Sequence, residues 1–149
     1  MLLRIEGTDL PGRTCGASPG FPGYENIHVG VQRKDRPAEL LDLQPGDADA
    51  DAVSWELECE PKQGPDGVEL HGRYIQNRLG GRFVYLSWGA VDAEGGFHMF
   101  RRAKLMLRDV DPAVLAAAVE SGVLVGRLGL TDPKGHPTCA TTHVAWTAE

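Results

Sequence analysis

Arg101 is the residue whose position in the sequence most clearly suggests binding chemistry. Counting every second residue from Phe97 places it on one face of an expected strand with five apolar residues, namely Phe97, Met99, Ala103, Leu105 and Leu107. A buried guanidinium is unfavourable unless an anion accepts its hydrogen bonds. The pattern leaves three alternatives: an internal acidic partner, a bound anionic ligand held through arginine's planar fork, or a β-bulge that turns Arg101 outward.

Aromatic side chains near Arg101 would shape a pocket around such a ligand. Residues 82–91 place Val84, Leu86 and Trp88 on one side of a strand and Phe83, Tyr85 and Ser87 on the other. Both faces are partly apolar, which predicts burial on both sides. We expect Arg101 to form the floor of a pocket whose walls are Tyr85, Trp88 and Phe97. His28 and Tyr74 are further ligand-binding candidates. The alternative is that these aromatic residues serve only as core, as aromatic residues in strands often do.

Cys15 offers a different chemistry, that of a nucleophile. It lies two residues from Arg13, and a nearby cation lowers the pKa of a thiol. A cofactor-independent enzyme would use Cys15, His28 or Tyr85 as nucleophile, base or acid. In the small-molecule-binding alternative, the glycine- and proline-rich residues 8–24 would act as a flap over the pocket at Arg101.

Metal and cofactor chemistry is not expected. His136 and Cys139 are the only metal-ligating pair close in sequence, and a lone pair is a weak signal because structural zinc takes four ligands. The phosphate-loop, dinucleotide-binding, hydrolase-elbow and C-x-x-C motifs are all missing from the sequence.

The charge distribution argues against nucleic acid as a partner. The net charge is −6, and Arg101, Arg102 and Lys104 are an isolated group of three cations in an acidic protein, which falls short of a nucleic-acid surface. The charges are segregated, because residues 35–69 carry eleven acidic and two basic side chains while residues 70–108 carry two acidic and seven basic ones. This segregation would steer an anionic small molecule, pair neighbouring subunits, or neutralise adjacent strands.

Cysteine content and hydropathy indicate a cytoplasmic protein. Cys15, Cys59 and Cys139 are an odd number at wide spacing, which favours free thiols in a reducing compartment. Cys59 falls on the apolar side of an alternating run and is expected in the core. The sequence has no apolar run of the roughly 18 residues that a membrane span requires, so we expect no membrane association.

Alternation with a period of two dominates the secondary-structure signal. It predicts strands at residues 26–33, 53–60, 82–91 and 97–107, with glycine-bearing hairpin turns near residues 63–67, 92–96 and 132–135. Asp111 as N-cap, Pro112 after it and Gly122 beyond the end predict one short helix at about 112–121. We expect a single mainly β domain over residues 1–149, an antiparallel barrel or two-sheet sandwich of about seven to nine strands.

Several segments resemble one family of proteins. They are residues 9–13 (DLPGR), 21–32 (FPGYENIHVGVQ), 82–89 (RFVYLSWG), 99–105 (MFRRAKL) and 126–135 (GRLGLTDPKG). Together they resemble an uncharacterised family of small actinobacterial (Streptomyces-type) proteins of unknown function. The resemblance implies a bacterial source and carries no activity, cofactor or catalytic residue.

Three functions follow from these patterns. The first is a small-molecule-binding protein, an accessory in metabolism, that grips an anionic ligand through arginine. The second is the cofactor-independent enzyme, marked by a titratable side chain close to Arg101 and to empty space. The third is a homodimeric structural or interaction protein, in which the two apolar faces of residues 82–91 reflect a subunit interface.

Overall fold

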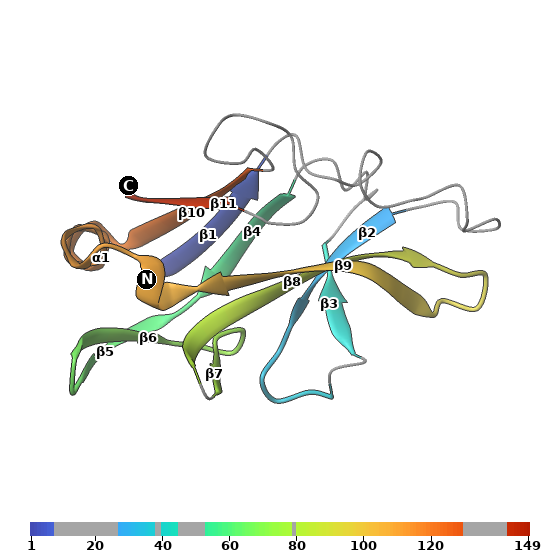
Figure 1. Cartoon of the computed structure of the whole chain (residues 1–149), viewed down its shortest axis with the longest axis horizontal. Coiled ribbons are helices and arrows are strands. Elements are labelled where there is room, and N and C mark those ends of the chain that lie inside the picture. The colour runs from blue at the N-terminus through green and yellow to red at the C-terminus, as the bar shows by residue number, and fades with distance from the viewer. Residues whose placement is uncertain (8–26, 38–39, 45–52, 79, 130–142) are drawn as a thin grey trace.

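The computed structural model describes residues 1–7, 27–37, 40–44, 53–78, 80–129 and 143–149, and only the backbone of Ile27, Ala90, Phe100 and Arg101. The chain is mainly β, with one α-helix in these ranges, as predicted (Figure 1). The described residues form eleven strands, somewhat more than the expected seven to nine. The excess includes two strands of three residues, β3 (Leu41–Leu43) and β7 (Gln76–Arg78), which are too short to show alternation.

The first sheet joins both ends of the chain. Its order is β11 (His143–Ala148), β10 (Val123–Gly129), β1 (Leu2–Gly7) and β4 (Val53–Glu58). β10 and β11 form the predicted antiparallel pair, whereas β1 and β10 run parallel. Two strands more than a hundred residues apart in the sequence give no local turn signal, so their pairing was not foreseeable from turn chemistry.

The second sheet is built around one long strand. β8 (Gly81–Val91) pairs with β2 (Ile27–Gln32) and β7 along one edge and with β9 (Phe97–Met106) along the other, while β3 extends the sheet beyond β2. A separate hairpin, β5 (Glu60–Gly64) and β6 (Gly67–His71), turns at the predicted residues 63–67. Figure 1 shows this hairpin at one end of the molecule, on the same side as α1.

The core lies between the two main sheets. Alternation in β4 buries Val53, Trp55 and Leu57 and exposes the residues between them. Side chains from β1, β2, β8, β9 and β10 complete this cluster, among them Leu3, Ile5, Val29, Val31, Val84, Leu86, Trp88, Leu105 and Leu124. Each such side chain stabilises the fold by about 1.5–3 kcal/mol, so one apolar face per strand accounts for the two-layer arrangement.

The helix α1 (Pro112–Ser121) begins and ends where its sequence predicts. The Asp111 carboxylate accepts a hydrogen bond of 2.8 Å from the Ala113 amide, and Gly122 ends the helix with φ 95°, its amide bonded to the Ala118 carbonyl. Ala118 is fully buried, with Val114 and Leu115 packed beside the core. A short 3₁₀ turn, η2 (Leu107–Asp109), leads from β9 towards α1.

A β-bulge breaks the alternation of β9 and corrects one expectation. Trp88 pairs with Arg101 but Gly89 pairs with Met99, so Phe100 is an extra residue. The positions of Phe97 and Met99 therefore lie on the opposite face from Ala103 and Leu105, and the prediction of one continuous apolar face from Phe97 is wrong. Gly89 permits this bulge, because a Cβ there would clash with the His98 carbonyl oxygen and stand 2.7 Å from Cζ of Phe97.

Candidate functional site

The predicted site residues on β8 lie on its two opposite faces. Trp88 faces the core with no exposed surface, and its Nε1 has no hydrogen-bond partner within the described residues. Tyr85 faces the other way and is half-buried. The backbone of Arg101 pairs with Trp88, and the position of its guanidinium lies outside the described part of the chain.

Tyr85 belongs to a row of aromatic rings and cations on the outer face of the second sheet. Its ring packs edge-on against Phe83, with 4.8 Å between centroids. The Arg102 guanidinium lies 4.7 Å from the Tyr85 centroid, and Lys104 Nζ lies 4.2 Å from that of Phe83. The rings beside Arg102 and Lys104 thus come from β8, but Phe83 is fully buried and offers no surface for stacking a base.

Phe97 and His28 share this outer face with Tyr85. Phe97 pairs with Val91 and His28 with Gly89, both on the same side of β8 as Tyr85. The structure therefore brings Tyr85, Phe97 and His28 to one face and leaves Trp88 on the other.

Tyr74 has a structural partner. Its hydroxyl donates a 2.7 Å hydrogen bond to Asp42, which also accepts one from Arg36. Burial and then the bond to Asp42 raise the pKa of Tyr74. This contact ties Tyr74 to β3.

Of the three cysteines, only Cys59 lies within the described residues. Cys59 is buried as expected, burial raises the pKa of its thiol, and its carbonyl accepts a 3.0 Å bond from the N-terminal amine. Cys15, the predicted flap at residues 8–24, His136 and Cys139 lie outside the described residues.

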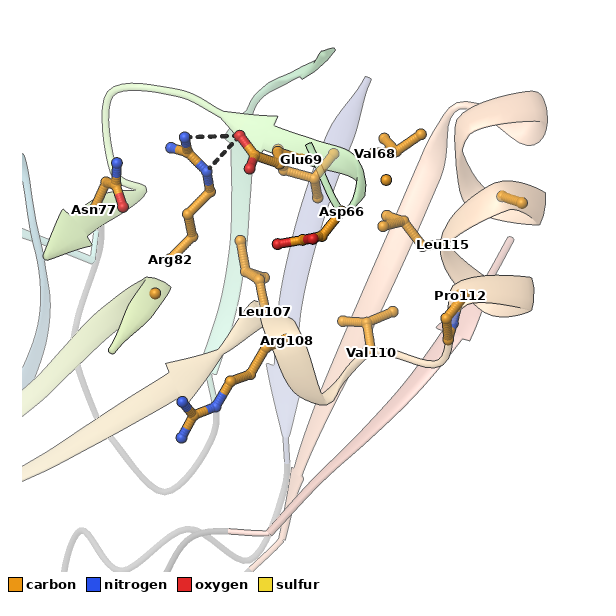
Figure 2. Close-up of a pocket in the computed structure, with 14 residues that line it drawn as sticks. Asp66, Val68, Glu69, Asn77, Arg82, Leu107, Arg108, Val110, Pro112 and Leu115 are labelled. Atoms are coloured by element: carbon orange, nitrogen blue, oxygen red, sulfur yellow. Dashed lines mark hydrogen bonds and ion pairs between the residues drawn. The ribbon is translucent and has the colours of Figure 1, made fainter. Parts of the chain in front are cut away.

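A cleft lies at the end of the β5–β6 hairpin. Its volume is about 520 Å³, and it lies between this hairpin, the start of β8, η2 and the first turns of α1 (Figure 2). We call it the hairpin cleft. Clefts of roughly 300–1,000 Å³ are the usual size of small-molecule sites.

One side of the hairpin cleft is polar. Arg82 donates two hydrogen bonds to one oxygen of Glu69, from Nε at 3.3 Å and from Nη2 at 2.9 Å. The same oxygen lies 3.3 Å from Nε2 of His71. Arg108 donates a 3.0 Å bond to the Gly80 carbonyl, and its side chain is 66% exposed. Figure 2 shows Asn77 and Arg82 near Glu69, and the Arg108 guanidinium at the other end of the cleft, pointing away from that of Arg82.

The opposite side is apolar and reaches solvent. Figure 2 shows Val68, Val110, Pro112 and Leu115 gathered there. Val68 is 38% exposed, whereas Leu70, also in the lining, is buried in the core cluster. The cleft is therefore part core surface and part accessible apolar wall.

Sequence reasoning did not select the residues of this cleft. The relevant signal was the charge segregation, because Glu69 closes the acidic segment and Arg82 belongs to the basic one, and the two pair on the polar side of the cleft. They lie on β6 and β8, which belong to different sheets and are not adjacent strands.

The described residues show neither a set of metal ligands nor a membrane-spanning helix. No three His, Cys, Asp or Glu side chains gather there as a set of metal ligands. None of the helices in that part of the chain has the length and apolar character needed to cross a membrane.

Comparison with known proteins identifies a family and no activity. A family model described as a family of unknown function, DUF5990, matches residues 1–149. The chain belongs to the DUF5990 family. This confirms the resemblance to an uncharacterised family, while the actinobacterial source stays a prediction. Neither a curated protein nor a solved structure matches this DUF5990 chain.

Proposed function

We propose that this DUF5990 protein binds a small organic anion with an apolar body in the hairpin cleft. The supporting observation is one cleft of about 520 Å³ that combines an arginine with an unused donor, Arg82, a second cation, Arg108, at its other end, and an accessible apolar wall. The proposal keeps the predicted class of ligand and transfers the binding arginine from Arg101 to Arg82.

Arg82 is the better-positioned of the two cations. Glu69 orients it through Nε and Nη2, and Nη1 has no hydrogen-bond partner within the described residues. Its side chain is 19% exposed, so it loses little mobility when a ligand binds. A carboxylate would accept from Nη1 of Arg82, and Arg108 would add positive charge at the other end of the cleft.

The apolar wall supplies the second part of the recognition. Each Å² of apolar surface removed from water contributes about 25 cal/mol. Val68 and Leu115 come from β6 and α1, so a ligand body between them would contact two separate elements.

A titration with 3-phenylpropanoate, followed by ¹⁵N–¹H NMR, tests the proposal. At about −0.3 kcal/mol for each of roughly eleven non-hydrogen atoms, the expected Kd is in the millimolar range. Arg82→Met should weaken binding by about tenfold, since hydrogen bonds to charged groups contribute about 1.5–3 kcal/mol.

Arg4→Met is the matched control. Arg4 pairs with Glu56 and Glu149 on the outer face of the first sheet, away from the cleft lining. Equal weakening in both variants, or no saturable shift in the wild-type protein, would contradict the proposal.

A further inference from the structure

Asp66 adds a negative charge to the hairpin cleft, and this charge has no partner within the described residues. It lies in the turn between β5 and β6. Glu69, by contrast, already accepts hydrogen bonds from Arg82. Of the two carboxylates in the lining, Asp66 is the one whose oxygens are available to a ligand.

Figure 2 shows the order of the groups along the cleft. Arg82, Arg108 and Leu107 lie on one side, with the two guanidinium groups pointing to opposite ends of the cleft, and Val68, Leu115 and Pro112 lie on the other side. The Asp66 carboxylate points into the space between these two sides. Across the cleft, a positively charged side chain is therefore followed by a negatively charged one and then by an apolar wall.

This order matches one class of ligand. From its proposed function as an anion-binding site, we propose that the hairpin cleft takes an α-amino acid with a large apolar side chain. Its carboxylate would face Arg82, its ammonium would face Asp66, and its side chain would contact Val68 and Leu115. In an α-amino acid the ammonium is attached to the carbon between the carboxylate and the side chain, as the cleft requires.

Ligands with only one charge fit less well. A plain carboxylate would lay its apolar body over Asp66 and remove that carboxylate from water without compensation. A plain amine would leave Nη1 of Arg82 without an acceptor. The four charges of Asp66, Glu69, Arg82 and Arg108 sum to zero, which suits a zwitterion.

Three related probes separate the contributions of the two ligand charges. Phenylalanine carries both charges, 3-phenylpropanoate lacks only the amine, and phenethylamine lacks only the carboxylate. We expect phenylalanine to bind about threefold more tightly than 3-phenylpropanoate, the effect of one exposed ion pair, and phenethylamine to bind most weakly.

Asp66→Asn should abolish the advantage of phenylalanine and leave the affinity for 3-phenylpropanoate unchanged or higher. Glu94→Gln is the control, because Glu94 is an exposed carboxylate in the turn of the β8–β9 hairpin, and it should preserve the advantage.

The outcomes distinguish this inference from the proposed function. If 3-phenylpropanoate binds in an Arg82-dependent manner but phenylalanine binds no more tightly, the α-amino acid assignment is overturned and the anion site stands. If the phenylalanine advantage survives Asp66→Asn, the role of Asp66 is overturned. If none of the three probes binds, both proposals fall.

Discussion

The two hairpin turns that contain Asp92 and Asp66 use the same residue type in opposite ways. In the β8–β9 hairpin, Asp92 accepts from the amides of Glu94 and Gly96 at 3.0 and 2.7 Å and lies 2.6 Å from Nε2 of His98. In the β5–β6 hairpin, Asp66 has no such partners in the described part of the chain and lines a cleft. The first aspartate holds its turn together, and the second is available to a ligand.

This contrast distinguishes charges that pair with one another in the fold from charges that we propose bind a ligand. Glu56, Arg4, Glu149, Arg127 and Glu6 form a continuous row of ion pairs on the outer face of the first sheet. Bonds to carboxylates, chiefly Glu149 for Arg4 and Glu6 for Arg127, raise the pKa of both arginines. Charges that satisfy one another in this way leave little capacity for a ligand, unlike the Asp66 carboxylate of the hairpin cleft.

The largest expected effect comes from loosening the anchor of the β5–β6 hairpin. Leu70 is 2% exposed and belongs to both the core and the cleft lining. Leu70→Ala should lower the free energy of unfolding by about 2–5 kcal/mol, as measured by urea denaturation. Val68→Ala, at an exposed position on the same strand, should cost less than about 1 kcal/mol, and an equal loss in the two variants would show that Leu70 is not an anchor.

A smaller effect is expected from disturbing the β8–β9 hairpin at its bulge. A Cβ at Gly89 would clash with the His98 carbonyl oxygen, so Gly89→Ala should destabilise the protein by about 1–3 kcal/mol in thermal or urea unfolding. Gly129→Ala is the control, because a Cβ there meets nothing within 4 Å. If Gly89→Ala is as stable as Gly129→Ala, the bulge does not depend on glycine.

The smallest effect distinguishes the two aspartates by pH. The His98 hydrogen bond, with help from the Gly96 amide, lowers the pKa of Asp92. A lowered folded-state pKa means that the ionised Asp92 stabilises the fold above the unfolded value of about 3.9 and that this contribution is lost as pH falls through the folded pKa.

Asp92→Asn should therefore be less stable than wild type at pH 5, and the difference should shrink as the pH falls below about 3.9. Urea denaturation across this range measures it. Asp66→Asn should match wild-type stability throughout, because no partner in the described residues is lost. A pH-independent gap for Asp92→Asn would contradict the account of the turn.

Local signals predicted those parts of the fold that depend on neighbouring residues. The N-cap at Asp111 and the glycine at 122 defined α1, and alternation defined β4 and β8. Local signals did not predict the bulge in β9, because it depends on the close approach of Gly89, on another strand, to the His98 backbone. The parallel pairing of β1 with β10 likewise depends on contacts between distant segments.

The candidate site was harder to predict than the fold. Counting every second residue along the expected strands drew attention to Arg101 and Trp88. The cleft instead gathers Asp66, Arg82 and Leu115 from three parts of the fold that carry no shared motif. The class of ligand was suggested by the charge segregation, but which arginine faces accessible space depends on how the hairpin, η2 and α1 meet.

Intermolecular NOEs test the central claim most directly, because they locate the ligand on the protein. With 3-phenylpropanoate bound, we predict NOEs from its aromatic protons to the methyl groups of Val68 and Leu115, on β6 and α1. NOEs to Leu41 and Leu43 of β3 instead, with none to Val68 or Leu115, would place the ligand outside the hairpin cleft and contradict the account.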